Sequence, residues 1–147
     1  FGYLGRFGEE KNIKNLILAI NNLSGNIKKS IECVLIGPID KDAKKLQELT
    51  KKLNLDEVII FTGPLYNEEK LEKLGNLDFY IHPAYSDVVS IAAMEAMACG
   101  LPLVITRTSQ ISYYYNSGSF LMMEPTENEI RKTILEMLEN KSNWKKK

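Results

Sequence analysis

The sequence predicts an α/β fold: a doubly wound, mainly parallel sheet of five to six strands with helices on both faces. One reason is that short apolar segments alternate with amphipathic segments of helical period along all 147 residues. Another is that the segment lengths suit the strand and helix units of a parallel sheet. Because no repeat, low-complexity tract or linker interrupts the pattern, one domain of residues 1–147 is expected. A domain of this size buries about 68–70% of its unfolded surface, enough for a core without disulfides or metals.

Three strands are predicted in the first half of the chain, at residues 1–7 (FGYLGRF), 33–37 (CVLIG) and 58–63 (VIIFTG). A helix over about 11–24 is expected after the first strand, because isoleucine and leucine side chains between Ile13 and Ile20 share one face. A helix at 42–55, with three leucines facing inward, is expected after the second strand. These segments make successive strand and helix units.

The second half continues the alternation, with strands expected at residues 78–83 (DFYIHP), 101–106 (LPLVIT) and, as a short sixth strand, 119–125 (SFLMMEP). Helices are expected at 67–76, 87–98 and 126–140. Thr126 is the expected N-cap of the last helix, with Glu129 three residues later. Ligands of doubly wound sheets bind at the carboxyl ends of the strands, where helix N-termini converge, so candidate site residues are sought there.

Charge and cysteine content narrow the class of protein. Lysine plus arginine equals aspartate plus glutamate at 19 each, so no global field favours nucleic acid or an anionic membrane. Cys33 and Cys99 lack metal-ligand spacing and are interpreted as small core residues of a reducing compartment, so a cytoplasmic location is expected. No apolar run approaches the roughly 20 residues of a membrane span, which leaves peripheral contact with the inner membrane surface open only for an intact parent protein. The strand-like start without Met suggests a piece of a longer protein.

The loop after the first strand combines features that suit an anion. Arg6 ends the strand, Lys11 opens the next helix, and Gly8 between them lets the backbone turn tightly. A guanidinium fork, an ammonium charge and free N–H groups around one spot are what a diphosphate needs. The alternative is structural: Arg6 pairs with Glu9 or Glu10, and Lys11 lies on the helix surface. The glycine spacing matches neither the dinucleotide fingerprint nor a Walker loop.

Two carboxylates, Asp87 and Glu95, lie in the otherwise small and apolar segment SDVVSIAAMEAMACGLP at 86–102. If 87–98 is helical, Asp87, Ile91 and Glu95 share one broad side, and the two acids are about 12 Å apart along the axis. Glycosidase carboxylate pairs lie only about 5–9.5 Å apart, which argues against a hydrolytic dyad. The acids are interpreted as holding hydroxyl groups at two ends of an extended ligand whose anion lies at the helix N-terminus. The alternatives are that Asp87 caps the helix and that Glu95 pairs with a buried lysine or arginine.

A nucleotide sugar has the layout that these residues suit, with a diphosphate between two sets of hydroxyl groups. The chain resembles the donor-binding C-terminal half of retaining GT-B glycosyltransferases of the group 1 (family 4) type. The resemblance lies in the order and spacing of LGRFGEEKN, VLIGPID, VIIFTGPLYNEEKLEKL, DFYIHPAYSDVVSIAAMEAMACGLPLVIT and ENEIRKTILEMLEN. Its most specific element is an acid, seven intervening residues, then Glu-Ala-Met-Ala, Gly and Pro. A Rossmann-like domain is implied.

The resemblance also implies roles for the charged residues. In that family the residues matching Arg6 and Lys11 bind the diphosphate, and the residue matching Glu95 holds the ribose hydroxyls. The residue matching Asp87 contacts the sugar being transferred. Arg6, Lys11 and Asp87 are therefore the candidate catalytic residues.

Backbone groups complete the implied site. The segment 88–90 lends N–H groups, and the loop 63–65 lies near the nucleobase. The candidate substrate-binding set is Arg6, Lys11, Gly37, Gly63, Pro64, Leu65, Asp87, Val88, Val89, Ser90, Ile91 and Glu95. Family members are generally metal-independent, so neither a metal nor a cofactor is expected.

The expected function is that of a retaining glycosyltransferase donor domain that binds a UDP- or GDP-sugar for transfer to a hydroxyl acceptor. The expected partner is the acceptor-binding N-terminal domain, which this chain does not match, and the isolated domain is expected to be inactive. Nucleic acid is not an expected partner. Asp87 stands where glutamate is usual and is followed by Val-Val-Ser, which keeps a non-catalytic nucleotide-sugar-binding module open. A nucleotide-sugar epimerase is a further alternative.

Other motifs are interpreted as mainly structural. The DKD motif at 40–42 lies where a helix begins, so capping is favoured over metal binding. His82, the only histidine, is interpreted as a local hydrogen-bonding residue rather than a catalyst. Packing is favoured over sugar stacking for Tyr85 and for the tyrosines of 113–115, and Trp144 is assigned to a frayed terminus. A receiver domain is excluded because no acidic cluster follows the first strand.

Overall fold

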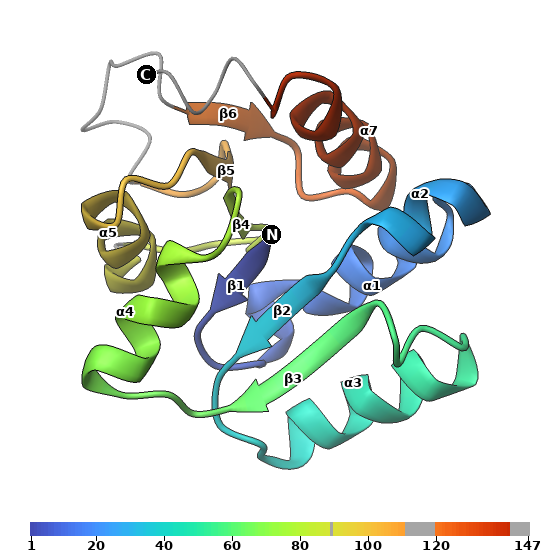
Figure 1. Cartoon of the computed structure of the whole chain (residues 1–147), viewed down its shortest axis with the longest axis horizontal. Coiled ribbons are helices and arrows are strands. Elements are labelled where there is room, and N and C mark those ends of the chain that lie inside the picture. The colour runs from blue at the N-terminus through green and yellow to red at the C-terminus, as the bar shows by residue number, and fades with distance from the viewer. Residues whose placement is uncertain (89, 111–119, 142–147) are drawn as a thin grey trace.

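The computed structural model describes residues 1–88, 90–110 and 120–141, which form one six-stranded sheet (Figure 1). Neighbouring strands are parallel throughout, in the order β3-β2-β1-β4-β5-β6. The strands are β1 (Gly2–Leu4), β2 (Cys33–Ile36), β3 (Ile59–Gly63), β4 (Tyr80–His82), β5 (Leu103–Thr106) and β6 (Phe120–Met123). The predicted α/β class is confirmed, including the short sixth strand.

Helices connect the strands and cover the sheet. They are η1 (Glu9–Lys11, a 3-10 turn), α1 (Ile13–Asn21), α2 (Gly25–Ser30), α3 (Lys41–Lys52), α4 (Asn67–Gly75), α5 (Ile91–Ala98) and α7 (Glu127–Glu139). Figure 1 shows α1, α3 and α7 on one face of the sheet and α4 and α5 on the other. Across the described ranges, no helix has both the length and the apolar character needed to cross a membrane.

The central strands are buried on both faces, which explains their continuous apolar runs. In β2, Cys33 and Leu35 pack in a cluster with side chains of α1, α3 and α7. Val34 and Ile36 pack in the other cluster, with side chains of α4 and α5. Successive side chains of a strand point to opposite faces, so four apolar residues in a row supply both cores. Cys33 is fully buried, which confirms its assignment to the core, and this burial raises the pKa of its thiol to about 12.

The helix predicted over about 11–24 is wrong at both ends. A 3-10 turn precedes it, and Asn12 in the left-handed conformation separates the two, with φ of 60°. The side-chain amide of Asn12 donates to the carbonyl oxygens of Pro83 and Pro125 at 2.9 Å each, which ties this junction to two other loops. The chain then starts an unpredicted helix, α2, with Ser24 as its N-cap. The periodicity of α1 is real, but the junctions around it are set by tertiary contacts.

Two predicted helix starts are confirmed. One Asp40 oxygen accepts from the backbone N–H groups of Asp42 and Ala43 at 3.0 Å each, so the DKD motif caps α3. Thr126 caps α7 by accepting from the N–H of Glu129 at 3.4 Å. The described residues contain no group of three or more histidine, cysteine, aspartate or glutamate side chains that could hold a metal ion.

Candidate functional site

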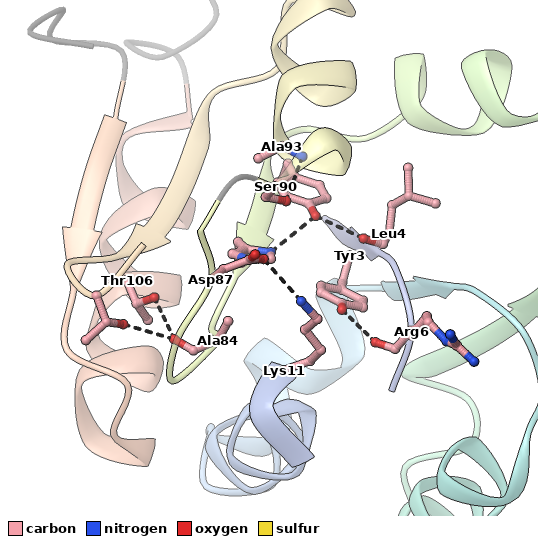
Figure 2. A network of polar contacts seen from close by, with 12 residues as sticks. Tyr3, Leu4, Arg6, Lys11, Ala84, Asp87, Ser90, Ala93 and Thr106 are labelled. Carbon is pink, nitrogen blue, oxygen red and sulfur yellow. Dashed lines mark hydrogen bonds and ion pairs between the residues drawn. The ribbon is translucent and has the colours of Figure 1, made fainter. Parts of the chain in front are cut away.

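The loops after β1 and β4 meet at the carboxyl edge of the sheet. Lys11 Nζ lies 3.2 Å from Asp87 Oδ2, and the two side chains are 22% and 14% exposed (Figure 2). The structure thus brings together two of the predicted site residues, and Lys11 does more than lie on a helix surface. Because Lys11 is half-buried and paired with Asp87, an anionic ligand must compete with the Asp87 carboxylate for the Lys11 ammonium.

Arg6 lies in the same loop but is exposed. Figure 2 shows its guanidinium directed away from Lys11 and Asp87. Its backbone carbonyl accepts from the Tyr3 hydroxyl at 2.7 Å, which fixes the loop while leaving the side chain outside. Within the described ranges Arg6 forms no ion pair, so the predicted alternative of pairing with Glu9 or Glu10 is not observed. The guanidinium is therefore available to an anion at the rim.

A buried histidine holds Asp87 from the other side. His82 Nε2 lies 2.8 Å from Asp87 Oδ2, and the ring is 2% exposed. Burial lowers the pKa of His82, and the Asp87 charge only partly opposes this, so the imidazole is neutral near pH 7. Because the carboxylate can only accept, Nε2 must carry the single ring proton and donate it to Asp87. The prediction that His82 is a local hydrogen-bonding residue is confirmed.

This burial makes stability depend on pH in a way that can be isolated. The folded-state pKa of His82 lies below its unfolded value of about 6.5, so the unfolded chain binds the extra proton first. The His82 contribution is therefore fully present above about pH 6.5 and is lost as pH falls below it. We expect the free energy of unfolding in urea to fall more between pH 7.5 and 5.5 in the wild type than in His82→Gln. Equal pH dependence of the two proteins would contradict the burial assignment.

Asp87 does not lie in the helix that the sequence predicted at 87–98. Helix α5 begins at Ile91, and its N-cap is Ser90, whose hydroxyl accepts from the Ala93 N–H at 3.1 Å. Asp87 instead forms an isolated parallel bridge with Ser109 beyond β5. Both the helical distance between the acids and the alternative of Asp87 as the helix cap are wrong. The physical reason is that Ser90 supplies the cap, while Lys11 and His82 hold Asp87.

Glu95 lies on the second turn of α5 and forms an ion pair with a lysine that the sequence did not single out. Lys70 Nζ of α4 lies 2.5 Å from Glu95 Oε1, and the side chains are 24% and 32% exposed. The predicted alternative of a pairing partner for Glu95 is thus observed, although the partner is not buried. One third of the Glu95 side chain still meets solvent, so a ligand hydroxyl can reach it. Its contact with a ribose stays a prediction.

Three glycines bring the ends of β1, β2 and β3 together. The Gly5 N–H donates to the Ile36 carbonyl at 2.9 Å, and the Gly37 N–H donates to the Gly63 carbonyl at 3.1 Å. Gly63 adopts φ of 80°, a left-handed value that turns the chain toward α4. Pro64 beyond it is exposed and Leu65 is half-buried. The loop 63–65, predicted to lie near the nucleobase, has no charged side chain of its own.

The remaining predicted residues around Asp87 differ in exposure. Ser90 is buried, whereas Val88 and Ile91 are 65% and 68% exposed. Val89 lies outside the described residues, as do the tyrosines of 113–115 and Trp144. Tyr85 is half exposed, and its hydroxyl accepts from the Asn15 amide at 3.0 Å. That hydrogen bond gives Tyr85 a local structural contact.

A cavity on the helical face of the chain lies apart from this site. A cavity of about 690 Å³ lies between α1 and α3, with Leu18, Leu46 and Leu49 in its wall. It touches the anion loop at Phe7 and Gly8 but is lined by none of the predicted site residues. The candidate site is instead a set of rim side chains, half-buried at Lys11 and exposed at Arg6.

Comparison with known proteins is consistent with this geometry. A family profile described as "Glycosyl transferases group 1" matches residues 1–147. The chain is 26% identical over 141 residues to an uncharacterized glycosyltransferase (MJ1069) of Methanocaldococcus jannaschii, covering 94% of this chain and 36% of the relative. It is 33% identical over 117 residues to a GDP-mannose-dependent alpha-mannosyltransferase of Corynebacterium glutamicum, covering 80% of this chain and 25% of the relative. The chain therefore spans only about a third or less of these relatives.

Solved structures support the same fold. The catalytic domain of the cholesterol-alpha-glucosyltransferase of Helicobacter pylori superposes with a TM-score of 0.82 at 28% identity, covering 99% of this chain and 91% of that one. Anabaena Alr3699/HepE in complex with UDP-glucose superposes with a TM-score of 0.83 at 19% identity, covering 98% of this chain and 40% of that one.

Proposed function

Since the chain belongs to the glycosyl transferases group 1 family, we propose that it is the donor-binding domain of a retaining glycosyltransferase. It binds a UDP- or GDP-sugar, whose sugar passes to a hydroxyl acceptor held by a second domain. The contact between Lys11 and Asp87 carries the proposal, because it joins loops 76 residues apart at the edge where doubly wound sheets bind ligands. The GDP-mannose dependence in the name of one relative and the UDP-glucose bound in one structural neighbour support this class of substrate.

Two cations serve the leaving group. Transfer breaks the bond between the anomeric carbon and the diphosphate and forms a bond from that carbon to the acceptor oxygen, whose hydroxyl proton passes to an oxygen of the departing diphosphate. Negative charge then gathers on the departing diphosphate, and Arg6 and Lys11 neutralise it. The exposed Arg6 turns inward to form a bidentate contact, while Lys11 acts from its half-buried position as a point charge. The N–H groups at the start of α5 add donors to the same anion.

Two acids hold the polyols on either side of the diphosphate. Asp87 accepts from hydroxyl groups of the transferred sugar, and Glu95 accepts from the ribose. Lys70 binds Oε1 of Glu95 and leaves the second carboxylate oxygen for the ribose. The loop 63–65 lies beside the nucleobase. In this proposal residues 1–147 form the donor domain, the acceptor domain is a separate unit, and efficient transfer needs both.

The proposal predicts that Arg6→Ala and Glu95→Ala each weaken binding of a nucleoside diphosphate about tenfold. Each variant removes one solvent-accessible charge-assisted hydrogen-bonding group, worth about 1.5 kcal/mol. Isothermal calorimetry of this chain with UDP and GDP measures the effect. Arg131→Ala and Glu136→Ala, on α7, are the matched controls and should bind like the wild type.

Unchanged affinity of both site variants would remove the proposed site. Release of nucleoside diphosphate by the intact parent protein, with an acceptor present, separates a transferase from a binding module. A binding module would retain the affinity pattern and release none.

A further inference from the structure

The imidazole of His82 is held in one orientation within β4. Its ring stacks near the rings of Tyr3 and Tyr80, with centroid distances of 6.1 and 6.2 Å and interplanar angles of 17° and 16°. The two tyrosines are themselves fixed, because their hydroxyls donate to the carbonyls of Arg6 and Leu4 at 2.7 and 3.1 Å (Figure 2). Burial raises the pKa of both phenols, so they remain protonated donors. The ring plane is therefore set by packing, and Nε2 is aimed at Asp87.

We propose that His82 is a positioning residue that holds the Asp87 carboxylate with Oδ1 toward the transferred sugar of the donor. This inference rests on the proposed function. The described contacts of the carboxylate with Lys11 and His82 are both made by Oδ2, at 3.2 and 2.8 Å. Two donors on one oxygen fix the rotation of the carboxylate, and the other oxygen keeps its lone pairs for a sugar hydroxyl.

Lys11 cannot fill this role alone. Its ammonium ends a flexible four-carbon stem and has the diphosphate as a competing partner in the donor complex. When Lys11 turns to the diphosphate, His82 remains bound to Asp87, because a strand and two stacked rings hold it in place. A neutral imidazole also orients the carboxylate without cancelling its charge, so Asp87 stays a strong acceptor.

The side-chain length required at position 82 gives the test its matched variants. A glutamine amide nitrogen can lie close to the position of the histidine Nε2, whereas an asparagine amide is too short to reach Asp87. We expect the wild type to bind a nucleoside diphosphate sugar more tightly than the nucleoside diphosphate, measured by calorimetry with UDP and UDP-glucose or GDP and GDP-mannose. This ratio of affinities is the sugar increment.

The His82→Leu and His82→Asn variants should lose the sugar increment, a change of about tenfold, while their affinity for the nucleoside diphosphate stays within about twofold of the wild type. His82→Gln should keep most of the increment. Asp87→Asn should lose as much of the sugar increment as His82→Leu. The double variant His82→Leu/Asp87→Asn should lose no more of the increment than either single variant. If His82→Leu does not fold, which circular dichroism reports, the comparison of Asn with Gln decides the question.

Equal weakening of both ligands in the His82 variants would overturn the positioning role, because it would mark a general structural defect. An unchanged increment in His82→Asn, or the absence of an increment in the wild type, would overturn it as well. Failure of the proposed function looks different, because the wild type would then bind none of the four ligands.

Discussion

Replacing Gly37 with alanine should lower the free energy of unfolding by about 3 kcal/mol or leave the chain unfolded. A Cβ on Gly37 would lie 2.0 Å from the carbonyl oxygen of Gly5 and 3.1 Å from its carbonyl carbon. Both atoms belong to the backbone, so no side-chain rotation relieves the clash. The end of β2 would have to move away from β1, which would also strain the hydrogen bonds from Gly5 to Ile36 and from Gly37 to Gly63. Urea denaturation of the variant measures the loss.

Gly75→Ala is the matched control. Gly75 is the last residue of α4, and an added Cβ there would have no atom within 4 Å apart from the neighbouring backbone of its own helix. Alanine favours a helix over glycine by up to about 1 kcal/mol, so this variant should be as stable as the wild type or slightly more stable. A Gly37→Ala protein with wild-type stability would show that the two strand ends can part, and the predicted donor loops would then not be rigid.

The fold could be predicted from the sequence because its strongest signals are local. Strand β2 has four apolar residues in a row because it is buried on both faces of the sheet. Helices α1, α3 and α7 have a 3.6-residue apolar period because each is buried on one face only. Helix α2 was not predicted, because only Ser24 marks its start and the segment has six residues. Asn12 ends the 3-10 turn through bonds to Pro83 and Pro125, contacts more than 70 residues away that no local pattern encodes.

The site was predicted in part for the same reason. The strand-end rule and the family resemblance predict Lys11 and Asp87 at one edge, and the structure adds a direct contact between them that the sequence did not predict. The predicted start of α5 is wrong because Asp87 and Ser90 both suit an N-cap. Only the tertiary partners of Asp87 decide between them. The Lys70 pairing with Glu95 links two helices 25 residues apart, and nothing in the charge pattern of α4 distinguishes Lys70 from its other lysine.

Lys11→Met should weaken binding of a nucleoside diphosphate by about 10- to 150-fold, the largest effect expected of any single site residue. The variant removes a half-buried charge-assisted donor worth about 1.5–3 kcal/mol. It also leaves Asp87 without its cationic partner, so that a largely buried carboxylate with only the neutral His82 beside it repels the diphosphate. Calorimetry with UDP and GDP measures the affinity.

Asp87→Asn should change the affinity for a nucleoside diphosphate in the opposite direction from Lys11→Met. In the unbound chain Asp87 holds the ammonium of Lys11, and a diphosphate must compete with it. Asparagine removes both this competition and the like-charge repulsion, so the affinity for a nucleoside diphosphate should rise severalfold even though the sugar increment is lost.

The double variant Lys11→Met/Asp87→Asn separates the two causes. If Lys11 acts directly on the diphosphate, the double variant should recover only the part of the Lys11→Met loss that came from the unpaired Asp87 charge, and it should stay well below the wild type. If Lys11 only neutralises Asp87, the double variant should bind the nucleoside diphosphate as well as Asp87→Asn. Full recovery would therefore contradict a direct role of Lys11 on the diphosphate, although its contact with Asp87 would still stand. The reason is that, once the Asp87 charge is removed, Lys11→Met can weaken binding only if Lys11 contacts the ligand directly.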